Sequence, residues 1–191
     1  MRSVKAGAAV VLVSLVAGGC GSSPDSAHHA RVMRCPARAL VLHPGTPVVP
    51  MTGEHAVKYA LTNRGPVTCT VHGYPRVVLY DANDDVLPFR YATGGGAYVT
   101  SSKPVTVVLA RGASAYVLVA KYRCDLGIAR NATTIRLTLA AAHGGLFAGR
   151  EAAGISGSAG LSYCRGGQHD PGQLVAVSPV EPTGQATSSL G

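Results

Sequence analysis

The chain has 191 residues and a formal net charge of +8 at pH 7, which comes from 17 Lys and Arg against 9 Asp and Glu. This length suits one domain with a substantial core and is too short for two. The basic residues stand singly, without the clusters and interleaved aromatic side chains that nucleic-acid binding uses, so we expect no nucleic-acid partner and a solvated basic surface instead.

The first 19 residues resemble the signal peptide of a bacterial lipoprotein. Arg2 and Lys5 precede an apolar run over 6–19, which is shorter than the roughly 20 residues of a membrane-spanning helix. Small residues then lead to Cys20, although Leu15 stands further back than in the usual lipobox and Ala17 takes its place. The resemblance implies export, acylation of Cys20 (palmitate among the acyl chains) and a lipid anchor on the outer face of the cytoplasmic membrane. Ordinary signal cleavage and secretion is the alternative.

Composition then divides the exported part into three segments. Residues 20–34, which contain several Ser, Gly and His, are expected to form a flexible tether. Residues 35–182 are expected to form the folded domain. Residues 183–191, rich in Thr, Ser and Gly, are expected to be a disordered tail.

Four of the five cysteines remain once Cys20 is assigned to the lipid. An even number in an exported chain predicts two disulfides, and four cysteines allow three pairings. We favour the nearest-neighbour pairs Cys35–Cys69 and Cys124–Cys164, with the other two pairings left open. A metal site is the weaker interpretation, because the sequence has no C-x-x-C and no His at ligand spacing from a Cys.

The first half of the domain alternates apolar and polar residues in short segments. Strands are expected at 38–42, 54–62, 67–71, 76–80 and 86–91, with turn signals between them. The stretch 63–75 has the strongest turn signals in the chain. Asn-Arg-Gly-Pro precedes the short strand that carries Cys69, and Gly-Tyr-Pro follows it. Segments 76–80 and 86–91 flank an Asp- and Asn-rich turn and are expected to pair as a hairpin.

The second half continues in the same manner. A long mobile loop is expected from Tyr91 to Pro104, then a hairpin of 105–109 with 115–121, and strands at 133–140, 159–164 and 173–177. Many short strands with little helical periodicity predict an all-β fold, an antiparallel Ig-like β-sandwich stapled by two disulfides. The chain has no Trp, so the antibody-type Cys-Trp-Cys core is absent.

One pattern of residues resembles a known family. Asn63-Arg64-Gly65, Cys69, Gly73-Tyr74-Pro75, Leu109-Ala110-Arg111-Gly112-Ala113, Cys124 and Cys164 resemble an actinobacterial family of secreted and lipid-anchored proteins, whose single domain is catalogued as a domain of unknown function. The resemblance covers roughly residues 35–182. It implies a β-sandwich at the cell envelope, and it carries no catalytic residues.

Candidate catalytic and metal motifs are incomplete. The glycine-rich segment 154–158 has Ser158 where a Gly-x-Ser-x-Gly elbow needs glycine, and the turn 81–85 lacks the glycine and the Glu of a calcium loop. The histidines show no His-x-His spacing. We therefore expect a protein that is not an enzyme and has no cofactor or metal.

The remaining candidate site is the loop from Tyr91 to Pro104. It carries Tyr91 and Tyr98, flanked by Arg90 and Lys103, and tyrosine beside a cation is a frequent contact pair. A plain connector is the competing interpretation. The function expected is a non-enzymatic binding or structural module of a cell-envelope lipoprotein that contacts another envelope protein or a polysaccharide. The alternative is an extracytoplasmic carrier of a metal or small ligand.

Overall fold

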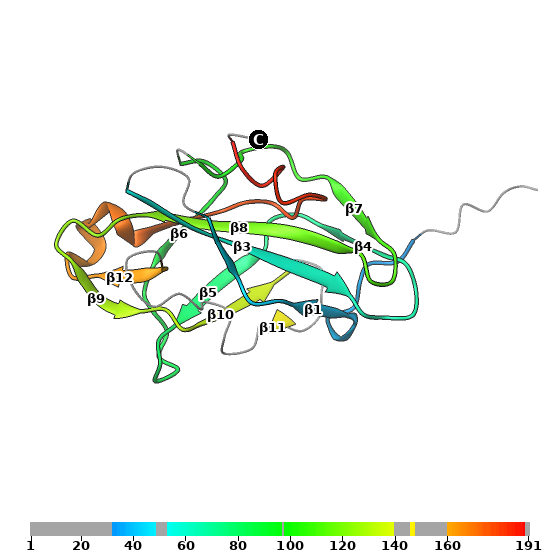
Figure 1. Cartoon of the computed structure of the whole chain (residues 1–191), viewed down its shortest axis with the longest axis horizontal. Coiled ribbons are helices and arrows are strands. Elements are labelled where there is room, and N and C mark those ends of the chain that lie inside the picture. The colour runs from blue at the N-terminus through cyan, green and yellow to red at the C-terminus, as the bar shows by residue number, and fades with distance from the viewer. Residues whose placement is uncertain (1–31, 49–52, 97, 140–145, 148–159, 190–191) are drawn as a thin grey trace, which may run out of the picture. The chain divides into compact units, whose positions relative to one another are not determined.

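Two layers of β-strands face each other in the computed structural model, which describes residues 32–48, 53–96, 98–139, 146–147 and 160–189 (Figure 1). The first half contains η1 (Ala37–Ala39), β1 (Leu40–Leu42), β2 (Thr46–Val48), β3 (Glu54–Asn63), β4 (Cys69–His72), β5 (Arg76–Tyr80) and β6 (Arg90–Thr93). The second half contains β7 (Thr106–Leu109), β8 (Ser114–Tyr122), β9 (Ile128–Asn131), β10 (Thr134–Thr138), β11 (Leu146–Phe147), β12 (Ser162–Cys164), η2 (Gly167–His169), η3 (Pro171–Gln173) and β13 (Leu174–Val177). Within the described residues, no helix is long and apolar enough to cross a membrane. The predicted signal peptide, Cys20 and most of the predicted tether lie outside this part of the chain.

The larger sheet is built on the antiparallel pair β3 and β8, which run side by side along its length (Figure 1). Its order is β1-β3-β8-β13-β6, and β2 also pairs with β3. The pair β13–β6 is parallel. The sheet is therefore mixed rather than wholly antiparallel as expected.

The second layer consists of the sheet β11-β10-β5 and two ribbons, β4–β7 and β9–β12, which lie toward opposite ends of the view in Figure 1. Successive side chains of a strand point to opposite faces of its sheet, so every second side chain of each layer points into one shared apolar core. This core includes Val57, Tyr59, Leu61 and Val117 from the large sheet, with Leu79, Ile135 and Leu137 from the second layer. The all-β class predicted from the sequence is confirmed.

Both predicted disulfides are present. Cys35 and Cys69 lie with Cα atoms 4.8 Å apart, and Cys124 and Cys164 lie with Cα atoms 5.2 Å apart. The first bond ties the leading segment to β4, where the Cys35 N–H also donates to the Thr70 carbonyl at 2.9 Å. The second bond ties the loop after β8 to β12. The nearest-neighbour pairing is confirmed.

The predicted hairpin of 76–80 with 86–91 is wrong. β5 pairs with β10, and among the described residues its backbone pairing with the returning chain amounts to a bridge between Tyr80 and Val86 and a hydrogen bond from the Leu87 N–H to the Leu79 carbonyl, 2.9 Å long. The Phe89 N–H, which would donate to β5 next, donates to the Leu87 carbonyl at 2.8 Å instead, so the ladder with β5 ends at Leu87. The chain leaves β5 and joins β13 as the parallel strand β6.

The predicted hairpin of 105–109 with 115–121 is also wrong. The turn 110–113 carries the chain from β7, which pairs with β4, into β8 of the large sheet. β8 is buried along most of its length, because Val117 and Val119 pack in the core between the layers and Leu118 and Ala120 belong to a second apolar cluster. After a short turn, the next strand can pair with the previous strand or enter the other layer. β8 enters the larger sheet, where both of its faces are buried.

The segments expected to be a mobile loop and a disordered tail are held together. The loop residue Val99 is 2% exposed and bridges Ser188, and the Thr100 N–H donates to the Thr187 carbonyl at 3.0 Å. Thr187 is fully buried. Polar composition predicted disorder for 183–191, but backbone hydrogen bonds to the loop 98–100 order the described part of this segment.

Asn63, at the end of β3, connects four parts of the fold. Its side-chain Nδ2 donates to the carbonyls of Val67 and Leu109, each at 2.9 Å, and its Oδ1 accepts from the Gly65 N–H at 2.9 Å. Its backbone carbonyl accepts from the Gly112 N–H at 2.7 Å. The side chain is fully buried. It holds the 64–68 turn and the end of β7 to β3.

The Tyr59 hydroxyl is buried without a hydrogen-bond partner among the described residues, and burial raises its pKa. Because an unsatisfied buried hydroxyl costs desolvation, we expect Tyr59→Phe to leave the free energy of unfolding unchanged or to raise it by about 1 kcal/mol. Urea denaturation measures this change.

Tyr91→Phe is the matched control, because the Tyr91 hydroxyl accepts from the Leu79 N–H at 3.1 Å. We expect that variant to lose about 1 kcal/mol. If Tyr59→Phe costs more than Tyr91→Phe, the Tyr59 hydroxyl has a partner in solution and the prediction fails.

Candidate functional site

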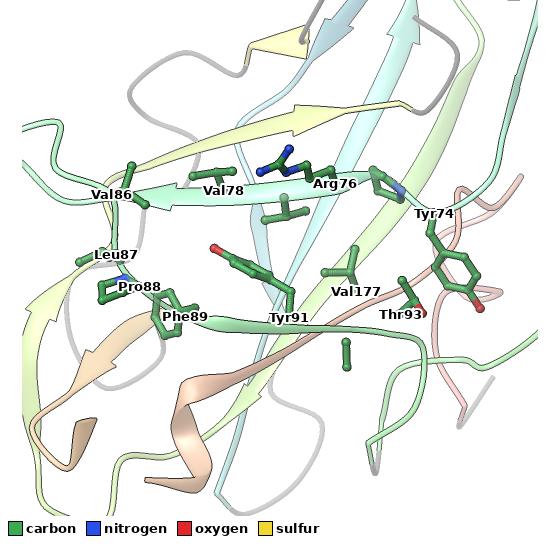
Figure 2. Close-up of a pocket in the computed structure, with 13 residues that line it drawn as sticks. Tyr74, Arg76, Val78, Val86, Leu87, Pro88, Phe89, Tyr91, Thr93 and Val177 are labelled. Atoms are coloured by element: carbon green, nitrogen blue, oxygen red, sulfur yellow. The ribbon is translucent and has the colours of Figure 1, made fainter. Parts of the chain in front are cut away.

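An apolar groove of about 470 Å³ lies between β5 and β6 (Figure 2). β5 ends the smaller sheet and β6 ends the larger one, so the groove opens where the edges of the two layers approach each other. Its lining is Tyr74, Pro75, Arg76, Val77, Val78, Val86, Leu87, Pro88, Phe89, Tyr91, Ala92, Thr93 and Val177. A concave, mostly apolar surface with a few polar groups is typical of a binding site.

Tyr91 reaches across the groove from β6 to β5 (Figure 2). Its hydroxyl accepts the hydrogen bond from the Leu79 N–H described above, although 39% of the residue is exposed. Burial of the hydroxyl raises the pKa of Tyr91 to about 12. The phenol therefore stays protonated at physiological pH and can donate a hydrogen bond to a ligand.

The free edge of β5 faces this groove. The Leu79 N–H and carbonyl point away from β10, since their partners are the Tyr91 hydroxyl and the Leu87 N–H. Val77 lies two residues earlier, so its N–H and carbonyl point the same way. Among the described residues, these two groups have no hydrogen-bond partner on that side. The edge thus offers one unused donor and one unused acceptor.

The Gly-Tyr-Pro motif forms one end of the groove. Gly73 has a φ of +96°, a conformation that favours glycine, and its carbonyl accepts from the Val180 N–H at 3.0 Å. The Tyr74 hydroxyl donates to the Ser102 carbonyl at 3.1 Å. The motif that is most specific in the sequence therefore lies beside the groove.

Among the described residues that line the groove, Arg76 is the only Lys, Arg, Asp or Glu. It is exposed, and the described residues give its guanidinium no ion pair or hydrogen bond. Figure 2 shows it along β5, above Tyr91. The groove therefore combines an apolar floor with one available cation.

The structure does not gather the four residues proposed from the sequence into one site. Tyr91 lines the groove, whereas Arg90 is an exposed neighbour on β6 outside the lining. Tyr98 lines a different cavity, together with Glu54 and Tyr122, and Lys103 is exposed and lines neither cavity. Sequence reasoning missed Val77, Leu87 and Phe89, because it assigned their segments to one hairpin. Pro88 inside the segment 86–91 was the available signal, because proline is rare within a paired strand.

Comparison with known proteins gives one match. A family model described as "Domain of unknown function (DUF4232)" matches residues 35–153, more than half of the chain, and includes β5 and β6. No curated protein and no solved structure matches significantly.

Proposed function

From the premise that the chain belongs to the family described as Domain of unknown function (DUF4232), we propose that it is a non-enzymatic binding module of the cell envelope. The groove between β5 and β6 receives an extended peptide segment of another envelope protein. The signal-like N-terminus supports export and lipid anchoring through Cys20, which would hold the groove near the membrane.

The observation that carries this proposal is the free strand edge inside an apolar groove. An extended peptide beside β5 would pair with the Val77 N–H and carbonyl, as peptides do when they add a strand to an exposed sheet edge. Its alternate side chains would enter the groove against Leu87, Phe89 and Tyr91. Backbone pairing would provide affinity, and the apolar floor would select the side chains.

The lining favours a peptide over a polysaccharide. Sugar hydroxyls need many hydrogen-bond partners, whereas most of this lining is aliphatic, aromatic or proline. Arg76 would pair with an acidic residue of the peptide, which agrees with the net charge of +8. The expected ligand is an extended segment with alternating apolar residues and an Asp or Glu near one end.

Site-specific photo-crosslinking in cells tests this proposal. A benzophenone amino acid at Val86, which is 56% exposed and lines the groove, should capture a defined peptide segment that mass spectrometry then maps. The matched position is Val108 on β7, which is 58% exposed and lies outside the lining. The same adducts at both positions, or none at Val86, would contradict the proposal.

A synthetic copy of the captured segment then tests the binding mode with the full-length protein. Val86→Asp should weaken binding by about tenfold or more, because it places a negative charge among apolar contacts, whereas Val108→Asp should leave it unchanged. Hydrogen exchange should slow at the Val77 amide when the peptide binds. Unchanged exchange at Val77 would exclude strand addition, and a small molecule recovered by native mass spectrometry in place of a peptide would favour the carrier function.

A further inference from the structure

Lys121 occupies a core position at the end of β8. The alternate residues 115, 117 and 119 of this strand are buried and apolar, and the next position in the alternation is Lys121, which is only 3% exposed. In the sheet register it lies opposite His55 of β3 and Val175 of β13. A lysine in such a position is unusual, because buried charges are normally paired.

The Lys121 ammonium has no direct counter-ion among the described residues. Its Nζ donates to the Tyr122 carbonyl at 2.7 Å and lies 3.7 and 3.8 Å from the sulfurs of Cys124 and Cys164. The ion pair found in this part of the chain joins Arg130 and Asp81 instead. Burial lowers the pKa of Lys121 to about 8, although the charges of Asp170 and Glu54 oppose this. The buried amine therefore lacks a contacting anion.

A cavity of about 270 Å³ adjoins this amine and is lined by three basic side chains. His55, Lys121 and Arg123 contribute to it, and the other lining residues are Cys124, Gly127, Ile128, Gly160 and Ser162. Among the described residues, no carboxylate lines it, and none of these lining residues also lines the groove between β5 and β6. Burial lowers the pKa of His55, and the charge of Lys121 lowers it further. An anion placed between His55 and Lys121 would offset the second of these effects.

We propose that this cavity binds a small oxyanion, a carboxylate or a phosphate, between Lys121, Arg123 and His55. The anion supplies the contacting counter-charge that Lys121 lacks. Arg123 also lines the cavity, with its guanidinium 5.9 Å from the centroid of the Tyr122 ring, and a guanidinium can donate two hydrogen bonds to an oxyanion. The cavity is many times larger than the roughly 30 Å³ share of a water molecule, so acetate or inorganic phosphate fits within it. This site is a second function of the domain, independent of the proposed peptide groove.

Titration calorimetry of the full-length protein with inorganic phosphate and with acetate, at constant ionic strength set by chloride, tests the site. Arg123→Gln should weaken binding of the preferred anion by about five- to tenfold, since it removes one charge-assisted interaction at an exposed position. Lys103→Gln removes an equal charge from an exposed residue outside the cavity and should change nothing. Equal weakening by both variants would show that only the net charge of the protein attracts the anion, and it would overturn the proposal. The absence of binding by the unmodified protein would also overturn it. The ratio of the two affinities distinguishes a carboxylate site from a phosphate site.

Proton uptake provides a readout that a purely structural lysine would not change. An anion beside Lys121 raises its pKa, so binding at pH 8 should draw protons from the buffer, and the measured heat should vary with the buffer's ionisation enthalpy. Glu54 and His55 of β3, Asp170 between η2 and η3, and Arg123 are the other charged groups near the amine. Lys121→Met should abolish most of the uptake while near-ultraviolet circular dichroism confirms its fold. Uptake that persists in Lys121→Met would overturn the assignment to this amine.

Discussion

Replacing Cys35 and Cys69 together by alanine is expected to lower the free energy of unfolding by about 4 kcal/mol. The disulfide closes a loop of 34 residues, and its removal raises the conformational entropy of the unfolded chain. Both sulfurs are buried, at 5% and 2% residue exposure, so the variant also loses core contacts. Guanidinium denaturation of the oxidised protein measures the change.

The pair Cys124 and Cys164 provides the comparison. It closes a loop of 40 residues, so the corresponding double alanine variant should lose a similar amount, about 4 kcal/mol. Full reduction of the unmodified protein should cost more than either variant alone. A loss below about 1 kcal/mol for Cys35 and Cys69 would show that the unfolded chain is already constrained near this bond and would contradict the prediction.

Asn63→Ala is expected to lower the free energy of unfolding by about 3 kcal/mol, the second largest effect. The substitution removes the three side-chain hydrogen bonds to Gly65, Val67 and Leu109 inside a fully buried site. The Leu109 carbonyl bond is buried, so its loss leaves an acceptor without a partner. Guanidinium denaturation measures the loss, and faster amide exchange at Gly65 should accompany it.

Asn131→Ala is the matched control. Asn131 is exposed on β9, and its Oδ1 accepts a hydrogen bond from the Ser162 hydroxyl at 2.8 Å. We expect this substitution to cost no more than about 1 kcal/mol. If the two asparagine variants lose equal stability, Asn63 is not the connection between β3, the turn and β7 that its contacts indicate.

The sequence predicts strand bounds best where one face of the strand is apolar and the other is polar. The segment 76–80 was placed with its true bounds, and 54–62 was short by one residue, because apolar and polar residues alternate along both. The disulfides were also predictable, because four cysteines besides Cys20 in a chain expected to be exported favour two bonds. The stretch 63–75 proved structurally central, because Asn63 and Gly73 both occupy positions that few other residues could fill.

The candidate site was predictable only in part. Tyr91 was selected because it stands in a loop-like segment near a cation, and it does line the groove. Its partners across the groove come from β5, whose outer edge is free only because β10 takes the other edge. The sequence gives no sign that Lys121 belongs to a site, because it follows the apolar positions of a strand as an ordinary polar residue would. Its amine lines a cavity only because residues of β3 and β9 lie beside it in the fold.

The sequence by itself determined the all-β class, the approximate strands, the two disulfides and the turns around Asn63 and Gly73. These depend on local periodicity, backbone conformation and cysteine number, which are all present within short windows of the chain. Only the tertiary structure decided which strands pair, that the tail from 183 onward packs on the loop at Val99, and where the groove and the cationic cavity lie. Pairing between distant strands depends on the packing of two whole layers. The backbone groups that pair are the same in every residue except proline, so the sequence of one strand does not specify its partner.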